Sequence, residues 1–196
     1  KIKIRLDDHY QVFHQHLPEK GVISDLGCGY GFMDYMLQQM APQRKMTGYD
    51  HDLDKVETAR HIALKNDGIN FIHADISQTD LMHSDAFLLI DTLHYLPHGE
   101  QEKILRNCIE HLNKGGCIII RDADSTMRKK HLGTRISEIF STGIGFNKTW
   151  KGEKKLYFAP REKYLDIFSQ YQLNVEVIDQ TKMNSNIIYI IKNQGI

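Results

Sequence analysis

Short apolar runs alternate with stretches of helical periodicity over roughly the first 120 residues of the chain. The run from Ala86 to Ile90 is almost purely apolar, which is typical of a strand buried on both faces of a sheet. Four other runs are shorter or more mixed, and each is followed by a glycine, an acid or a polar turn. The runs predict five strands, at residues 22–25, 45–50, 69–73, 86–90 and 117–120.

Helices are predicted between these strands. The segment Phe32–Met40 carries apolar side chains at helical spacing and ends near Pro42. Similar patterns predict helices at residues 1–18, 52–66 and 97–112. Alternating strands and helices indicate a parallel sheet covered on both faces, in which the carboxyl ends of the strands share one edge.

The last third of the chain has a different pattern. It predicts helices at 134–140 and 161–171, with an aperiodic aromatic stretch at 141–158 between them. Two closing strands, 175–178 and 187–191, are joined by a polar turn at 182–186 and predict an antiparallel hairpin at the sheet edge. The expected fold is therefore α/β, a Rossmann-like doubly wound sheet of seven strands that is mostly parallel.

The first predicted strand runs into a glycine-rich turn. Gly27, Gly29 and Gly31 alternate between the strand and the following helix. Glycine has no Cβ and tolerates positive φ, so the main chain of such a turn can approach a ligand closely. Strand, glycine turn and helix together indicate the first unit of a nucleotide-binding sheet.

Four acids fall at or just beyond predicted strand ends: Asp25, Asp50, Asp75 and Asp91. One such acid alone is more often a solvated loop residue or a helix cap. Four of them behind a glycine turn favour a ligand site at the shared edge.

The chain resembles the class I S-adenosylmethionine-dependent methyltransferases over roughly residues 20–125. Five segments in order carry the resemblance: DLGCGYG (25–31), GYD (48–50), HADI (73–76), LLIDTLHYLP (88–97) and NKGG (113–116). The resemblance implies a seven-stranded sheet whose last strand is inserted antiparallel. It also implies that S-adenosyl-L-methionine is the cofactor and S-adenosyl-L-homocysteine the product.

Cofactor contacts follow from the resemblance and the chemistry of the side chains. Asp50 accepts both ribose hydroxyls, Asp75 and Ile76 hold the adenine, and Asp25 lies near the cationic methionine end. The full set expected to bind the cofactor is Asp25, Gly27, Cys28, Gly29, Gly31, Asp50, His51, Asp75, Ile76 and Asp91. A dinucleotide site is disfavoured, because the third glycine of Gly-x-Gly-x-x-Gly is replaced by the bulky Phe32.

His94 follows the fourth predicted strand and is the candidate general base, with Tyr95 and Asp91 near enough in sequence to position it. The alternative is that His94 packs against the cofactor or caps the next helix. His94 and His98 are separated by Pro97 at a helix start, so we expect no metal site. Asp122 and Asp124 follow the fifth strand, where a loop-bonding role is the more common one.

The chain is expected to form a single domain covering residues 1–196. Within it, four aromatic residues are expected to contact the acceptor. Tyr10 belongs to the predicted helix at 1–18, and the resemblance implies that this helix is a lid over the cofactor pocket. The alternative is that the Tyr10 side chain only packs against its own helix. Phe146 and Trp150 lie in the 141–158 stretch, a substrate-side loop, and Tyr95 adjoins His94. Long loops of this kind are often functional.

Composition narrows the class of acceptor. Lys+Arg and Asp+Glu both total 25, which disfavours a partner held by phosphate neutralisation, such as a nucleic acid. No apolar run approaches the length of a membrane span, and three scattered cysteines favour a reducing, cytoplasmic setting. The chain begins at Lys1, so fusion to other domains of a longer parent is expected.

These features favour methyl transfer to a small molecule. The LLIDTLHYLP and IIIRDAD segments also resemble methyltransferase modules of bacterial aryl-polyene and flexirubin pigment pathways, which implies a hydroxyaryl acceptor. Two alternatives remain: a module that binds the cofactor without catalysis, and another transferase that uses an S-adenosylmethionine-type cofactor on the same fold.

Overall fold

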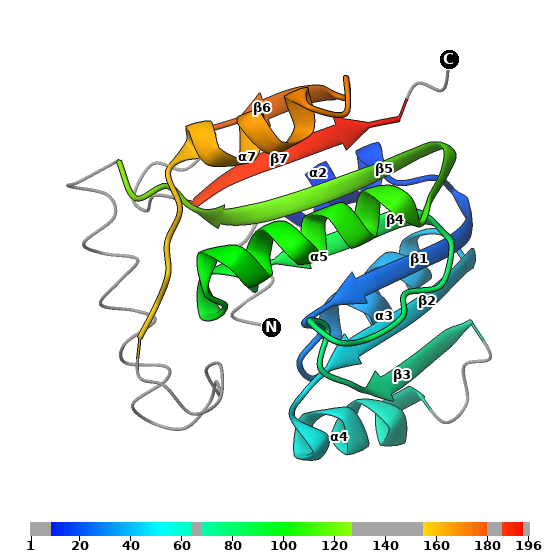
Figure 1. Cartoon of the computed structure of the whole chain (residues 1–196). Helices are drawn as coiled ribbons and strands as arrows, with labels where there is room; N and C mark the ends of the chain where they lie inside the picture. Colours follow the sequence, from blue (N-terminus) through cyan, green and yellow to red (C-terminus); the bar gives the residue numbers. More distant parts are fainter. Residues whose placement is uncertain (1–8, 64–67, 127–154, 180–185, 194–196) are drawn as a thin grey trace.

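The computed structural model describes residues 9–63, 68–126, 155–179 and 186–193 (Figure 1). In these residues a seven-stranded sheet has the order β3-β2-β1-β4-β5-β7-β6. Strands β1 to β5 run parallel, and β7 is antiparallel to both β5 and β6. The expected fold class and C-terminal hairpin are confirmed. The strands are β1 Lys20–Leu26, β2 Gln43–Asp50, β3 Ile69–His73, β4 Ser84–Ile90, β5 Leu112–Ala123, β6 Asn174–Ile178 and β7 Asn186–Lys192.

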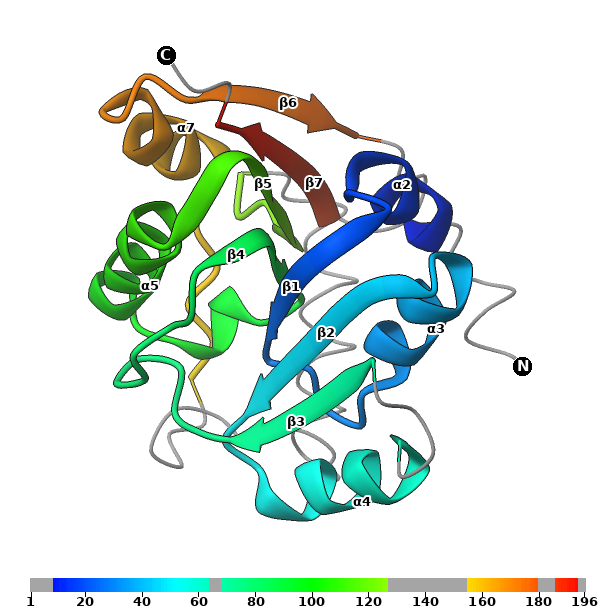
Figure 2. The same cartoon turned by 90° about the vertical axis from the view of Figure 1, so that its right-hand side faces the viewer.

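Helices cover both faces of the sheet (Figure 2). One face is packed by α2 His9–His16, α3 Phe32–Met40 and α4 Leu53–Ala63. The other is packed by α5 His98–Glu110 and α7 Arg161–Ser169, with a 3-10 turn, η1 Leu93–Tyr95, before α5. None of the helices in the described part of the chain has the length and hydropathy needed to span a bilayer.

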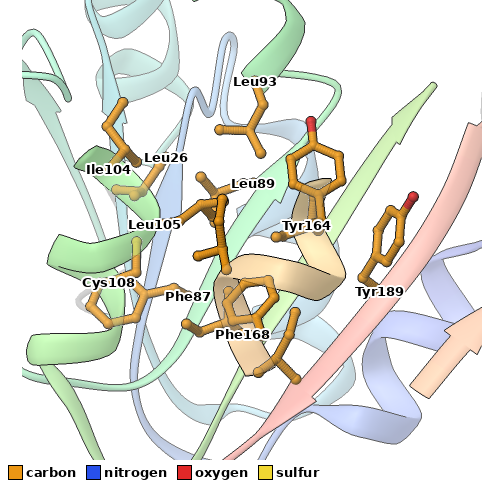
Figure 3. Close-up of a cluster of buried hydrophobic side chains, with 14 of the residues drawn as sticks. Leu26, Phe87, Leu89, Leu93, Ile104, Leu105, Cys108, Tyr164, Phe168 and Tyr189 are labelled. Carbon is orange, nitrogen blue, oxygen red and sulfur yellow. The ribbon is translucent and has the colours of Figure 1, made fainter. Parts of the chain in front are cut away.

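Strand β4 lies near the centre of the sheet and is apolar on both sides. Phe87 and Leu89 join the cluster that contains Leu105 of α5 and Phe168 of α7 (Figure 3). Ala86 and Leu88 face the opposite cluster, with α2 and α3. Period-two alternation across a doubly covered sheet therefore accounts for the uninterrupted apolar run.

The start of β5 differs from the expectation. The segment Asn113–Gly116 was expected only to end the preceding helix, but it lies within β5. Its glycines allow this: Gly115 has φ 78° and donates its N–H to the Asn193 carbonyl, and a Cβ on Gly116 would lie 2.7 Å from the Asp85 carbonyl oxygen. The predicted helix 134–140 and the predicted turn residues 182–185 lie outside the described residues, as do residues 1–8 and 141–154 of two other predicted segments.

Arg44 of β2 joins two helices to the sheet. Its side chain is buried and donates to the carbonyl oxygens of Pro18 (2.7 Å), Leu37 (2.9 Å), His14 (3.2 Å) and Leu17 (3.3 Å). These carbonyls lie at or just after the C-terminal ends of α2 and α3, where helix carbonyls lack partners within the helix. One guanidinium thus fixes both helices to the start of β2, at the edge of the sheet opposite the glycine turn.

We predict that Arg44→Met lowers the free energy of unfolding by about 2–4 kcal/mol, because several buried carbonyls lose a charged donor. Urea unfolding measures the change. Lys45→Met is the control, since Lys45 is exposed on the same strand and should change stability by no more than about 0.5 kcal/mol. Equal effects of the two substitutions would contradict the role given to Arg44.

Candidate active site

The glycine turn between β1 and α3 has the expected geometry. Gly27, Gly29 and Gly31 have φ values of 92°, 57° and 69°. The N–H groups of Gly27 and Cys28 both donate to the Tyr49 carbonyl oxygen, at 2.7 and 3.0 Å. These bonds hold the turn against the end of β2, at the carboxyl edge of the sheet.

Packing around the turn shows which glycines are required by their neighbours. A Cβ on Gly31 would lie 2.2 Å from Cζ of Phe71, and one on Gly27 would lie 2.4 Å from Oγ1 of Thr92. A Cβ on Gly29 would meet nothing within 4 Å. The loop is therefore closely packed at both ends and has room in front of its middle residue, which fits the close approach of a ligand to bare main chain.

Asp50 contacts this loop directly. Its Oδ2 accepts a hydrogen bond from Gly29 N at 2.8 Å, and its Oδ1 accepts one from Asp52 N at 2.8 Å. The neighbouring His51 is exposed, with Nδ1 3.7 Å from Asp50 Oδ1. The predicted ribose-binding acid and the glycine turn are thus brought together.

Asp75 and Ile76 lie just beyond β3. The Asp75 carboxylate accepts hydrogen bonds from Ser77 N (3.0 Å), Ser77 Oγ (2.7 Å) and Gln78 Nε2 (3.2 Å). These contacts match the turn-capping alternative, and Ile76 is buried. Adenine binding by this pair remains a prediction.

Asp91 is engaged by a cation. It follows β4 with φ 53° and forms an ion pair with the buried Arg121 of β5, whose Nε lies 3.0 Å from Asp91 Oδ1. Asp91 was expected to position His94, but its carboxylate pairs with Arg121 instead. A cofactor contact at Asp91 remains a prediction.

His94 is paired with a different acid. Its Nδ1 lies 2.6 Å from Asp122 Oδ1, and the side chains of both are almost completely buried. The imidazole stacks on Phe158 at 4.8 Å between ring centroids and lies 4.3 Å from Tyr95. When Nδ1–H donates to the carboxylate, Nε2 is the basic nitrogen of the ring.

Two residues that sequence reasoning missed support this pair. The Tyr164 hydroxyl of α7 donates to Asp122 Oδ2 at 3.3 Å, and burial raises the pKa of Tyr164 well above its usual value, so it remains a donor. Gln101 Nε2 contacts the Leu93 and Leu96 carbonyls at 3.0 and 2.9 Å, which fixes the turn that carries His94. Neither residue belongs to a recognisable motif.

The remaining predicted residues are placed as follows. Tyr10 is buried, and its ring meets that of Phe32 edge to face at 6.1 Å, so it packs on the helix after the glycine turn. Asp124 accepts from Thr126 N and Oγ1, both at 2.8 Å, which is the loop-bonding role. Phe146 and Trp150 lie outside the described residues.

Asp25 lies within β1 behind the glycine turn and is 2% exposed. Sequence reasoning missed the carboxyl that it faces, Asp34 of α3, which is fully buried. Burial and the neighbouring acid raise the pKa of Asp25 well above its usual value, and burial raises the pKa of Asp34 to about 7. Asp34 is three residues before Leu37, so helical periodicity places both on the inward face.

Comparison with known proteins agrees with this geometry. Residues 23–116 match the family model described as a methyltransferase domain. The match covers just under half of the chain, and the family it points to is that of a methyltransferase domain. The match begins in β1, covers the glycine turn, Asp50 and His94, and ends early in β5.

Curated relatives of the domain are distant. A carboxy-S-adenosyl-L-methionine synthase from Campylobacter curvus is 23% identical over 113 residues, which cover 57% of this chain and 48% of that protein. A trans-aconitate 2-methyltransferase from Rhodopseudomonas palustris is 24% identical over 135 residues, which cover 66% of this chain and 46% of that protein. The chain thus spans about half the length of the curated relatives it matches.

Solved structures share the fold of the methyltransferase domain. Human N-acetylserotonin methyltransferase, in complex with S-adenosylmethionine, has a TM-score of 0.71 at 17% identity. The superposition covers 96% of this chain and 52% of the human protein chain. Magnesium protoporphyrin IX methyltransferase from Synechocystis, with bound S-adenosylhomocysteine, has a TM-score of 0.66 at 17% identity. The superposition covers 93% of this chain and 78% of the Synechocystis chain.

We predict different costs for two alanine substitutions in the glycine turn. Gly29→Ala should lower the free energy of unfolding by about 1–2 kcal/mol, the cost of a left-handed residue with a Cβ. Gly31→Ala should cost more than about 3 kcal/mol, because its Cβ also overlaps the Phe71 ring. Urea unfolding of both variants tests this, and equal losses would contradict the packing described for Phe71.

Proposed function

We propose that this chain transfers a methyl group from S-adenosylmethionine to a hydroxyl of a small, hydroxyaryl-type acceptor, with His94 as the general base. The observation that carries the proposal is the buried His94–Asp122 pair, with 2.6 Å between Nδ1 and Oδ1. The pair lies at the same sheet edge as the glycine turn. The edge thus combines a nucleotide-type cradle with an oriented imidazole.

The cofactor half of the proposal is supported by the glycine turn and Asp50. Open space in front of Gly29 gives room for the methionine part of the ligand beside bare main chain. Asp50 ends β2 next to this loop, and its carboxylate is suited to accept hydroxyl groups of a ribose. Asp75 and Ile76 follow on the next strand, where the adenine would extend.

Methyl transfer at this edge requires the protein mainly to align the acceptor with the methyl group and to remove the proton of the acceptor hydroxyl. When bound, the cofactor supplies a methyl group on a sulfonium, already activated for in-line displacement. Asp122 orients the imidazole through Nδ1, which would leave Nε2 to take the proton of the acceptor hydroxyl while the methyl carbon exchanges its bond to the cofactor sulfur for one to the acceptor oxygen. His94 is 2% exposed, so little water reaches its imidazole.

The aromatic surroundings of His94 support a flat, apolar acceptor. Phe158 stacks on one side of the imidazole, with 18° between the ring planes, and Tyr95 lies beside it. Zero formal net charge also favours a small molecule over a nucleic acid. A phenol combines an aromatic body with a hydroxyl that a neutral imidazole can deprotonate during transfer.

We predict that Asp50→Ala weakens binding of S-adenosylmethionine at least about 100-fold, because two charge-assisted hydrogen bonds to the ribose are lost. Titration calorimetry gives the dissociation constant. Asp54→Ala is the control, since Asp54 is exposed in the first turn of α4 and should bind as the unaltered chain does. Unchanged affinity in Asp50→Ala would exclude Asp50 as the ribose acid.

We predict that His94→Gln and Asp122→Asn each lower kcat about 100-fold or more and leave cofactor affinity within about twofold, because general-base assistance is lost and the cradle is retained. Turnover with radiolabelled cofactor and a panel of phenols measures kcat. His61→Gln, at an exposed position of α4, is the matched control.

The same assay separates the alternatives. Full turnover by His94→Gln would remove His94 as the base. Cofactor binding without turnover on any acceptor would favour a non-catalytic module. Mass spectrometry of the products would reveal an altered cofactor in place of a methylated phenol, the result expected of a different transferase on this fold.

A further inference from the structure

The end of strand β4 is held by an ion pair that the proposed reaction does not use. Asp91 follows β4, and its N–H donates to the Arg121 carbonyl oxygen at 2.8 Å, which continues the pairing of β4 with β5 beyond Ile90. The Arg121 side chain binds the same residue: Nε donates to Asp91 Oδ1 at 3.0 Å, and Nη2 pairs with Asp91 Oδ2. One residue of β5 therefore holds both the main chain and the carboxylate of Asp91.

Arg121 is a firmly placed anchor for this contact. Its side chain is buried, and Cζ lies 5.7 Å from the ring centroid of Phe13 in α2, within the range of a cation–π contact. Asn186, the first residue of β7, also donates to the carboxylate, with 3.4 Å between its Nδ2 and Asp91 Oδ1. The end of β4 is thus tied to two neighbouring strands.

Asp91 has a main-chain conformation that a residue with a Cβ seldom adopts. Its φ is 53°, in the left-handed region, where the Cβ of an L-residue is crowded. A strained conformation of this kind persists only where surrounding contacts maintain it, and such residues gather at functional sites. The ion pair to Arg121 supplies such a contact.

The residues after Asp91 connect two parts of the candidate site. Thr92 packs on the glycine turn, because a Cβ on Gly27 would lie 2.4 Å from Oγ1 of Thr92. His94 follows in the 3-10 turn η1, and its Nδ1 lies 2.6 Å from Asp122 Oδ1. The direction in which the chain leaves β4 therefore affects both the glycine turn and the imidazole.

Strand β5 holds this loop at two points. Arg121 and Asp122 are adjacent in the strand, so their side chains point to opposite faces of the sheet. Arg121 lies on the face covered by α2, and Asp122 on the face covered by α7. The first binds Asp91 and the second binds His94, so the loop between these two residues is fixed at both ends.

We propose that Arg121 and Asp91 are positioning residues for His94. Their ion pair keeps Asp91 in the left-handed region, and this conformation directs the loop so that His94 meets Asp122. The inference rests on the proposed function, because it takes His94 as the general base. Without the pair, Asp91 relaxes to an unstrained conformation and the imidazole loses the alignment that methyl transfer requires.

The first experiment is nuclear magnetic resonance of the ligand-free full chain carrying isotope-labelled histidine. A short hydrogen bond to a buried carboxylate moves an imidazole N–H proton downfield, and His94→Gln assigns the signal. We expect Arg121→Met and Asp91→Gly each to shift this signal upfield or to broaden it beyond detection. Arg106→Met is the matched control, since Arg106 forms its ion pair with Glu102 within α5 and should leave the signal unchanged.

Turnover gives the second readout. We expect Arg121→Met and Asp91→Gly each to lower kcat about tenfold or more, because a displaced base is no longer aligned with the acceptor hydroxyl. Cofactor affinity should change by less than about threefold, since the glycine turn keeps its bonds to the Tyr49 carbonyl. The glycine substitution separates the ion pair from the main chain, because glycine adopts positive φ without strain and has no carboxylate.

A double variant shows whether the two residues act as one unit. Arg121→Met combined with Asp91→Gly removes both charges, so no buried guanidinium is left without its carboxylate. We expect its kcat to lie within about threefold of the single variants, well above the product of their separate losses. It also keeps the test decisive where a single variant folds poorly, and thermal melts verify that each variant is folded.

Outcomes separate this inference from the proposed function. An unchanged His94 signal in both single variants would overturn the positioning role and leave His94 as the base. Full kcat in Asp91→Gly, or losses that multiply in the double variant, would also overturn it. Absence of the signal from the unaltered chain would contradict the short bond between His94 and Asp122, and this inference with it.

The proposed function fails in a different way. Absence of turnover by the unaltered chain on every acceptor would overturn methyl transfer to a phenol. The His94 signal is recorded without ligand or turnover, so it would still decide whether Arg121 and Asp91 position the imidazole.

Discussion

The close packing of the glycine turn between three strands is the constraint on which the rest of the site depends. Its N–H groups bond to the end of β2 through the Tyr49 carbonyl, and Phe71 and Thr92 fill the space where Cβ atoms of Gly31 and Gly27 would lie. Only glycine therefore fits at positions 27 and 31. The turn is consequently held in place by contacts within the chain, and a Cβ on Gly29 would meet nothing within 4 Å.

Charge is distributed unevenly around this turn. On one side, Asp25, Asp34 and Asp50 lie near Cys28, and burial together with these acids raises the pKa of its thiol. On the other side, Asp91 is balanced by Arg121. The sheet edge thus has a group of neighbouring acids on one side and an acid paired with a cation on the other. The His94–Asp122 pair lies on the second side, supported by Tyr164.

Much of the fold followed from local sequence patterns, and so did the positions of the strand-end acids. The apolar runs located the parallel strands within a few residues, because doubly covered strands carry a strong signal. The start of β5 was missed because glycines that usually end a helix here join a strand. Asp34 was missed because the helix was predicted from the spacing of its apolar residues, and that spacing does not show that an acid lies on the inward face.

The partner of His94 depends on long-range geometry. Asp122 meets His94 because β5 pairs beside β4 with Ile90 opposite Arg121, and this register is set by the packing of the whole sheet. Tyr164 reaches the same carboxylate from α7, 42 residues further along the chain. No local pattern encodes either contact, so sequence reasoning chose Asp91, which is nearer along the chain.

A crystal structure with S-adenosylhomocysteine bound tests the central claim most directly. The account predicts the ligand's ribose at Asp50, its amino-acid end in front of Gly29 on the side of Asp25, and its sulfur on the side of His94. Electron density for the ligand at any other place on the molecule, or a side chain filling the space before Gly29, would contradict it.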